Sequence, residues 1–244
     1  MCTTCGCRHE HDEHQTTRLV AVEEDILARN QADAALARAY FRKNRILALN
    51  LVSSPGSGKT ELLAATLQWP TLKALTMSVI EGDLKTDNDA ERIRRTGARA
   101  VQINTGRGCH LSAEQVLAAL GPLQPSPGSI VFIENVGNLV CPAEFDLGEA
   151  HKVVLLSVTE GDDKPLKYPD LFAAADLMII NKIDLLPYVS FSLERCEENA
   201  RRVNPRLTIL RTSATTGEGL PDWARWLLAQ SAPAQKRGPC HASS

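Results

Sequence analysis

An apolar run at residues 46–53 (ILALNLVS) leads directly into a glycine-rich turn, SPGSGKT, and then into a helical segment. Glycines in such a turn let backbone N–H groups face a phosphate, and the N-terminus of the helix adds a favourable dipole. Lys59 would reach the β- and γ-phosphates of a nucleotide, and the Thr60 hydroxyl would bind Mg²⁺. The sequence therefore predicts a phosphate-binding loop. Its predicted nucleotide contacts are Ser54, Gly56, Ser57, Gly58, Lys59, Thr60 and Glu61.

One position departs from the usual G-x-x-x-x-G-K-[ST] pattern of such loops. Serine stands at position 53, where the pattern has its first glycine. The GSGKT core still follows a strand-like run and opens a helix, which is the context that a phosphate-binding loop requires. This context favours the loop over a chance glycine-rich turn.

Six more apolar runs follow, and helical stretches separate them. Several are continuous rather than alternating, as expected for strands covered on both faces. Strands that alternate with helices predict an α/β fold with a doubly wound, mostly parallel sheet. The predicted strands are residues 46–53, 74–80, 98–103, 130–134, 153–158, 177–180 and 207–210. Predicted helices between them include residues 59–68, 113–120, 192–203 and 220–230.

The 244-residue chain divides into four predicted parts. Residues 1–18 are polar and rich in Cys and His, which predicts a flexible metal-binding tail. Residues 19–44 have helical periodicity and many alanines, and they predict an N-terminal helix. Residues 45–231 are the predicted nucleotide-binding domain, and residues 232–244 are predicted to be disordered.

Composition excludes some partners. The formal net charge of −2 indicates no general attraction to nucleic acid or to an anionic membrane. No apolar run approaches the roughly 18 residues of a membrane span, and the N-terminus lacks the basic and apolar regions of a secretory signal. These features predict a cytoplasmic protein whose cysteines stay reduced, so the cysteine pattern indicates metal or redox chemistry before disulfides.

A second nucleotide motif follows the sixth apolar run. The segment Asn181-Lys182-Ile183-Asp184 has the NKxD pattern. An aspartate carboxylate accepts hydrogen bonds from both the ring N–H and the exocyclic amine of guanine, and adenine lacks this pair of donors. The pair Ser213-Ala214, after the last strand, would donate a backbone N–H to the guanine oxygen. The sequence thus predicts GTP rather than ATP, and a helix cap at Asp184 is the alternative.

Two acidic positions stand at strand ends between these motifs. Asp83 closes the second predicted strand and Glu134 closes the fourth, at the edge where open α/β sheets bind ligands. Both are predicted to bind Mg²⁺ or to position water, with a helix cap or solvated turn as the alternative. The predicted catalytic residues are Lys59, Thr60, Asp83 and Glu134.

Three thiols lie within the first seven residues, at Cys2, Cys5 and Cys7 (the tail cysteines). Thiolates select soft or borderline ions such as Ni, Zn and Cu(I). With the α-amine of Cys2, they would offer an S₃N set that suits square-planar Ni(II), and tetrahedral Zn stays open. A redox CxxC pair is the alternative. The nearby imidazoles of His9, His11 and His14 either add ligands or belong to a solvated tail.

A second group of metal-binding residue types lies inside the domain. Cys109 and His110 follow the third predicted strand, and Cys141 follows the fourth. Adjacent loops at one sheet edge would bring the two thiols and the imidazole together. Free cysteines are often simply small buried hydrophobes, which is the alternative here. No role follows from the sequence for Cys196 or Cys240.

Together, the segments CTTCGC, SSPGSGKT, GRGCHL, ENVGNLVCP and NKID resemble the motif set of the HypB family. These are P-loop GTPases of the SIMIBI class that insert nickel into nickel–iron hydrogenase during its maturation. The resemblance covers almost the whole chain. Ser53 and Glu134, which depart from general GTPase patterns, are tolerated within that family.

The resemblance implies that the tail cysteines form a high-affinity nickel site. It implies that Cys109, His110 and Cys141 form a weaker site for nickel or zinc near a dimer interface. It further implies a homodimer promoted by nucleotide and metal, and two partners: a HypA-like metallochaperone and the hydrogenase large-subunit precursor. GTP hydrolysis is expected to be slow, because no arginine finger is identifiable from the sequence.

Three other interpretations stay open. A nickel or zinc storage protein would not need an intact Lys59, Thr60 and Asp184. The related GTPase that delivers nickel to urease lacks the CxxCGC and GxGCH segments. An ATP-dependent small-molecule kinase would not need Asp184.

Overall fold

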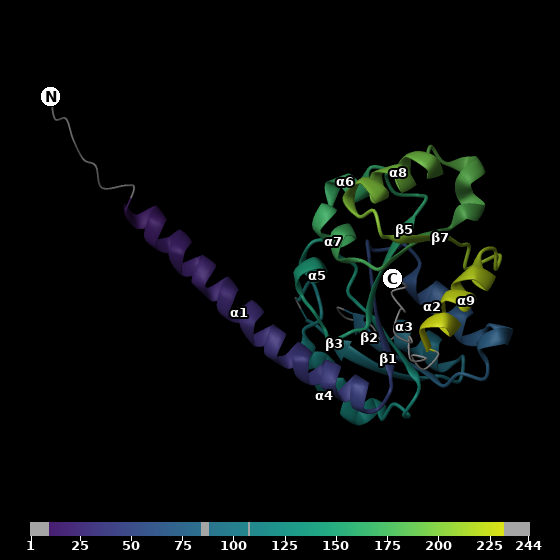
Figure 1. Cartoon of the computed structure of the whole chain (residues 1–244), viewed down its shortest axis with the longest axis horizontal. Helices are drawn as coiled ribbons and strands as arrows, with labels where there is room; N and C mark the ends of the chain where they lie inside the picture. Colours follow the sequence, from purple (N-terminus) through teal and green to yellow (C-terminus); the bar gives the residue numbers. More distant parts are fainter. Residues whose placement is uncertain (1–9, 84–87, 107, 232–244) are drawn as a thin grey trace, which may run out of the picture.

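The computed structural model describes residues 10–83, 88–106 and 108–231, with residues 10–24, Asp83 and Asn88 described by their backbone alone. Within these ranges a seven-stranded sheet of order β3-β2-β4-β1-β5-β6-β7 forms the centre of the molecule (Figure 1). Every strand pair in it is parallel. The strands are β1 (Leu47–Ser53), β2 (Met77–Asp83), β3 (Arg99–Asn104), β4 (Ile130–Glu134), β5 (His151–Ser157), β6 (Leu177–Asn181) and β7 (Thr208–Arg211).

Helices cover both faces of this sheet (Figure 1). The α-helices are α1 (Glu10–Lys43), α2 (Lys59–Gln68), α3 (Asn88–Arg94), α4 (Ala113–Leu123), α5 (Cys141–Glu144), α6 (Lys164–Lys167), α7 (Pro169–Ala174), α8 (Leu193–Val203) and α9 (Leu220–Ser231). Two 3₁₀ helices are η1 (Pro70–Leu72) and η2 (Ile183–Tyr188). The predicted fold class, a doubly wound α/β sheet, is confirmed, and each predicted strand is present within a few residues of its expected bounds.

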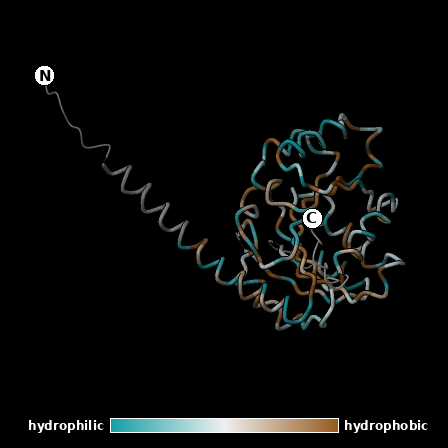
Figure 2. Tube along the Cα trace, in the orientation of Figure 1, coloured by the Kyte–Doolittle hydropathy of each residue, from teal (hydrophilic) through white to brown (hydrophobic). Residues whose placement is uncertain are grey.

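Strand β1 supplies the core on both faces, because successive side chains point to opposite sides. Leu49 and Leu51 pack with α2 and α9 on one face. On the other face Ala48 packs with α1 and α4, and Val52 packs with α7 and α8. Figure 2 shows this hydrophobic interior and its hydrophilic rim. Strands β2 to β4 lie on one side of β1 and strands β5 to β7 on the other, so the C-terminal end of β1 lies at the switch point where such folds bind ligands.

Helix α1 begins at Glu10, nine residues before the predicted start at residue 19. Residues 10–18 lack apolar side chains, which is why the sequence predicts a tail there, but their Glu, Gln and Arg residues favour helix. The first half of α1 projects from the domain (Figure 1). The second half is anchored: Asn30 Oδ1 accepts a hydrogen bond from the Ala113 backbone N–H at 2.9 Å, and Arg38 pairs with Asp146 at 2.6 Å.

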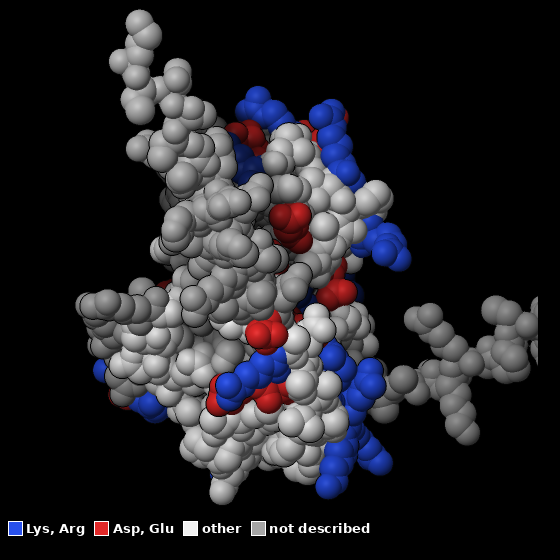
Figure 3. All heavy atoms as spheres, turned by 90° about the vertical axis from the view of Figure 1, so that its left-hand side faces the viewer, with Lys and Arg blue, Asp and Glu red and all other residues white. Residues whose placement is uncertain are grey.

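The surface is mixed in charge. On the face shown in Figure 3, Lys and Arg side chains lie among Asp and Glu side chains, and uncharged surface separates the groups. This agrees with the small net charge of −2. In the described ranges, no helix combines the length and the apolar content that a bilayer crossing demands.

A glycine-dependent turn supports the loop that follows β7. Gly219 has φ +73°, and a Cβ there would lie 1.8 Å from the backbone oxygen of Arg211. We expect Gly219→Ala to lower the free energy of unfolding by more than about 3 kcal/mol, because the backbone itself must move. Gly217→Ala is the matched control: it has φ +82°, but its nearest neighbour is a Trp69 ring atom at 3.6 Å. The control should lose only about 1–2 kcal/mol in chemical denaturation, and equal losses would contradict the steric explanation.

Candidate nucleotide and metal site

The phosphate-binding loop joins β1 to α2 through left-handed glycines. Gly56 and Gly58 have φ of +74° and +95°. A Cβ at Gly58 would lie 2.7 Å from Asn181 Nδ2, so this position also needs glycine for close approach. The loop therefore has the compact form that lets backbone N–H groups surround a phosphate.

The serine at position 53 has a structural role in this loop. Its hydroxyl oxygen accepts hydrogen bonds from Lys59 Nζ at 2.8 Å and from Ser57 Oγ at 2.6 Å. Ser53 Oγ in turn donates to the Ser54 backbone oxygen at 2.7 Å. The departure from glycine thus provides a buried partner for the Lys59 ammonium.

The NKxD segment braces the phosphate-binding loop. Asn181 Nδ2 donates to the Ser57 backbone oxygen at 3.0 Å, and Asn181 Oδ1 accepts from the Ala214 backbone N–H at 3.3 Å. Lys182 Nζ donates to the Gly56 backbone oxygen at 2.7 Å. One asparagine and one lysine therefore hold together the phosphate loop, the end of β6 and the loop after β7.

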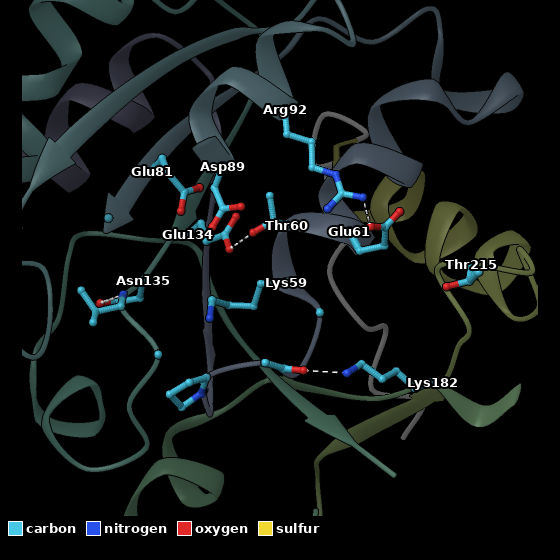
Figure 4. A pocket seen from close by; sticks show the side chains of 16 residues that line it. Lys59, Thr60, Glu61, Glu81, Asp89, Arg92, Glu134, Asn135, Lys182 and Thr215 are labelled. Carbon is cyan, nitrogen blue, oxygen red and sulfur yellow. Dashed lines mark hydrogen bonds and ion pairs between the residues drawn. The ribbon is translucent and has the colours of Figure 1, made fainter. Parts of the chain in front are cut away.

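A cavity of about 550 Å³ opens over this loop (Figure 4). Of the predicted nucleotide contacts, the cavity is lined by Gly56, Gly58, Lys59, Thr60, Glu61 and Lys182. The other predicted contacts, which do not line it, are Ser54, Ser57, Asn181, Asp184, Ser213 and Ala214. Asp184 is half-buried at the start of η2, and Ala214 precedes the lining residue Thr215. The predicted base-recognition residues are therefore close in the chain to residues that line the cavity.

Carboxylates gather on the opposite side of this cavity from Lys182 (Figure 4). Glu81 and Glu134 are register partners on β2 and β4, so their side chains share one face. Both are buried, and Thr60 Oγ1 donates to Glu134 Oε1 at 2.7 Å. The Oε2 atom of each glutamate has no hydrogen-bond partner among the described residues. Two orphaned carboxylate oxygens beside a hydroxyl fit the oxygen ligands that Mg²⁺ prefers.

Burial dominates the electrostatics of these carboxylates. Burial, together with repulsion from the Glu134 charge, raises the pKa of Glu81 to about 11. Burial also raises the pKa of Glu134, against the opposing attraction of Lys59. A divalent cation in the cavity would stabilise the ionised forms of both groups.

The structure adds Glu81 to the candidate Mg²⁺ ligands. Asp83 ends β2, but its side chain lies outside the described part, so its Mg²⁺ and catalytic roles stay predictions. Glu81, two residues earlier on the same face of β2, lines the cavity. Alternation along a strand cannot choose between positions i and i+2. The register between β2 and β4 places Glu81 beside Glu134, and this strand pairing does not follow from the sequence.

Two further lining residues come from α3, a helix that is not among those predicted from the sequence. Asp89 and Arg92 both line the cavity, and the Arg92 guanidinium forms an ion pair with Glu61 (Figure 4). Helix α3 is short and has no apolar periodicity. The available signal was its position a few residues after the end of β2, at the ligand-binding edge of the sheet.

A second cluster lies at the same sheet edge. The ligand atoms of Cys109, His110 and Cys141 (the inner thiolate site) all lie within 4.8 Å of one another. The two sulfur atoms are 2.8 Å apart, and Cys109 Sγ is 3.4 Å from His110 Nδ1. Asn138 Nδ2 donates to the Cys109 backbone oxygen at 3.2 Å and so ties the two loops together. The structure thus brings together the three predicted inner ligands.

The chemistry of these three groups suits a soft or borderline divalent ion. Burial lowers the pKa of His110, so its imidazole is neutral and able to bind a metal near pH 7. The hydrogen bond with Cys109 raises the pKa of the Cys141 thiol. Metal binding at this site must therefore displace thiol protons.

Other predicted metal residues lie elsewhere. The tail cysteines, His9 and Cys240 fall outside the described residues, and His11 and His14 are described by backbone alone within α1. Cys196 is fully buried among apolar side chains of α7 and α8, and burial raises its pKa to about 12. Cys196 is therefore a core residue.

A doubly wound parallel sheet with this phosphate loop and NKxD brace defines a P-loop nucleotide-binding protein. Residues 47–211 match the family model described as CobW/HypB/UreG, nucleotide-binding domain. The chain belongs to the HypB hydrogenase maturation factors within this family. It is 62% identical to the hydrogenase maturation factor HypB of Rhizobium leguminosarum bv. viciae over 216 residues, which is 88% of this chain and 72% of the relative. It is 56% identical to the Escherichia coli HypB, over 87% of this chain and 73% of that protein.

Solved structures agree with this assignment. The crystal structure of HypB from Helicobacter pylori in complex with nickel has a TM-score of 0.78 and 40% sequence identity, covering 83% of this chain and 95% of that chain. The HypB structure from Archaeoglobus fulgidus also has a TM-score of 0.78, with 37% identity and coverage of 84% and 99%. The predicted family resemblance is confirmed.

Proposed function

We propose that this chain is a GTP-hydrolysing metallochaperone that inserts nickel into the large subunit of nickel–iron hydrogenase during maturation. The observation that carries the proposal is the inner thiolate site, whose ligand atoms lie within 4.8 Å of one another. Its Cys141 follows Glu134, a lining residue of the nucleotide cavity, by seven positions on one continuous segment. Nucleotide and metal therefore act on neighbouring parts of the same backbone.

The nucleotide is proposed to be GTP. Asp184 supplies the carboxylate that guanine's two N–H donors require, and Asn181 and Lys182 hold its loop against the phosphate loop. Lys59 and the loop N–H groups would bind the phosphates. Thr60, Glu134 and Glu81 would hold Mg²⁺, which supplies charge neutralisation at the phosphates when it is bound. Hydrolysis is expected to be slow. Arg92 lines the cavity, but its guanidinium is paired with Glu61, so it is not available to stabilise charge at the phosphates as an arginine finger would.

The coupling follows from the Glu134–Cys141 segment. Thr60 holds Glu134 by a 2.7 Å hydrogen bond, so a change at the Thr60 hydroxyl on nucleotide hydrolysis would move the start of this segment. Cys141 at its other end would then change its distance to Cys109 and hence the affinity for nickel. Thermodynamic linkage makes the effect reciprocal, so nickel would also alter nucleotide affinity.

The client and partners are inferred from the relatives. Identity of 50–62% with proteins named hydrogenase maturation factors, against 40% with Helicobacter proteins named hydrogenase/urease maturation factors, favours hydrogenase over urease. We expect a homodimer promoted by nucleotide and metal, and a HypA-like metallochaperone as a second partner. Nickel bound by the tail cysteines would be a source for the inner thiolate site, and zinc is the competing ion at both sites.

GTP is expected to drive nickel out of the inner thiolate site. The full chain with its tail cysteines changed to serine isolates that site. Adding GTP should raise the rate of nickel transfer to a coloured chelator about fivefold or more relative to GDP, the lower range of usual allosteric coupling. The absorbance of the chelator complex measures the transfer.

Two variants of the same chain control this transfer assay. Lys59→Ala should show no acceleration by GTP, because the phosphates are no longer turned over. Cys141→Ser should carry little nickel at the start, because one of two thiolate ligands is lost. Equal transfer rates with GTP and GDP in the unmodified inner site would overturn the proposed function.

A further inference from the structure

Four buried polar side chains form a continuous chain that begins at the nucleotide cavity, which Asn135 lines (Figure 4), and ends beside the inner thiolate site. They are Asn135, Asn50, Glu149 and Lys152, here named the buried polar relay. Asn135 and Asn50 are 1% and 0% exposed, and the side chains of Lys152 and Glu149 are 9% and 7% exposed. A stabilising role does not explain this group, since well-packed apolar residues often replace buried charges without loss of folding stability.

The first member, Asn135, links the nucleotide cavity to one metal loop. Asn135 directly follows Glu134, just beyond the end of β4, and both residues line the cavity. A backbone shift that moves Glu134 therefore also moves Asn135. Asn135 Oδ1 accepts a hydrogen bond at 3.0 Å from the backbone N–H of Leu111, the residue directly after the metal-site His110.

The middle of the relay crosses β1 and reaches β5. Asn135 Nδ2 donates to Asn50 Oδ1 at 3.2 Å, and Asn50 Nδ2 donates to Glu149 Oε1 at 3.1 Å. Asn50 and Lys152 are register partners on β1 and β5, so their side chains lie on one face. Asn50 stands between Ala48 and Val52, which belong to two separate apolar clusters of this face.

The last member, Lys152, holds the second metal loop. Lys152 Nζ donates to the backbone oxygens of Pro142 at 2.9 Å and Ala143 at 3.1 Å. Both carbonyls belong to α5, which begins at the metal-site Cys141. Glu149 Oε1 lies 4.0 Å from the Lys152 ammonium and balances its charge. The relay is therefore anchored one residue beyond His110 at one end and one residue beyond Cys141 at the other.

We propose that the buried polar relay positions the two arms of the inner thiolate site relative to each other and carries the nucleotide state from Glu134 to Cys141 by a second route. This inference rests on the proposed coupling of nucleotide and nickel. Asn50, Glu149 and Lys152 belong neither to the cavity lining nor to the three metal ligands, so they are positioning residues and not catalytic ones.

The test is a nickel titration of the full chain, with tail cysteines changed to serine, in GDP and in a non-hydrolysable GTP analogue. Thiolate-to-nickel absorbance reports occupancy and coordination. In the reference chain the two nickel Kd values should differ by about fivefold or more. In Lys152→Met and in Asn50→Leu the ratio should fall to within about twofold of one, with a changed absorbance spectrum. Lys152→Arg should restore the ratio, because it keeps a cation that donates to the α5 carbonyls.

Thr66→Val is the matched control, because Thr66 is a buried side chain that accepts from Trp223 Nε1 at 2.9 Å on the other face of the sheet. It should lower the unfolding temperature while the Kd ratio stays as in the reference chain. If nickel affinity depends on the nucleotide in the reference chain and the same Kd ratio is found in folded Lys152→Met, the relay is overturned while the proposed coupling stands. A ratio lost equally in Thr66→Val also overturns it, since general loosening then explains the effect. If the nickel Kd of the reference chain is the same in GDP and in the GTP analogue, the proposed coupling is overturned, and the relay with it.

Discussion

The Lys59→Ala variant is expected to hydrolyse GTP about two to three orders of magnitude more slowly than the unmodified chain, the usual effect of losing one preorganised charge partner. The Lys59 side chain lines the nucleotide cavity and is only 9% exposed, so its charge acts with little screening by water. Its ammonium is held by Ser53 Oγ at 2.8 Å, next to the loop that would surround the phosphates. Single-turnover release of phosphate measures the chemical step directly.

The control for this experiment is Lys73→Ala, an exposed lysine that follows η1 and does not line the cavity. It should hydrolyse GTP at the rate of the unmodified chain. Loss of Lys59 also leaves Ser53 with one fewer partner, so thermal unfolding of both variants must show that the fold is retained. A Lys59→Ala rate within tenfold of normal, in folded protein, would show that hydrolysis does not depend on this cation.

Much of the sheet was predictable because its strands are buried on both faces. Runs such as residues 130–134 and 177–180 are continuous and apolar, and each corresponds to a strand within one residue. The short helix α3 was not predictable in the same way, because a two-turn helix shows no apolar period and its residues are mostly charged. Asp89 and Arg92 of the cavity were missed for that reason.

The meeting of Cys109 and Cys141 was predictable only in part. Both follow strands whose carboxyl ends share one edge, which the sequence indicates. The strand order does not follow from the sequence, and it places β2 between β3 and β4, so one loop must cross the end of β2. Gly82 of β2 permits this crossing: a Cβ there would lie 2.8 Å from the Leu111 side chain. Contacts over such a distance in the chain depend on tertiary packing, as does the buried polar relay.

Base specificity gives the second large expected effect. We expect Asp184→Asn to lower GTP affinity by about two orders of magnitude or more and to give measurable binding of xanthosine triphosphate. The Asp184 carboxylate has two acceptor oxygens for the ring N–H and the exocyclic amine of guanine, and no described residue donates a hydrogen bond to it. An asparagine of the same size offers one acceptor and one donor. That pair matches xanthine, which carries an oxygen where guanine has its amine.

Competition against a fluorescent guanine nucleotide measures the exchange of specificity, with ATP as a third competitor that neither protein should bind well. Asp170→Asn, an exposed aspartate on α7, controls for the loss of one negative charge and should keep GTP preference. The substitution turns one hydrogen-bond acceptor into a donor without changing the size of the side chain, so a specific effect should change the preference between guanine and xanthine. A general loosening of the loop would instead weaken the binding of all three nucleotides alike. Unchanged GTP binding by Asp184→Asn would mean that another group reads the base, and the inference of a guanine-specific site from the NKxD segment would then be wrong.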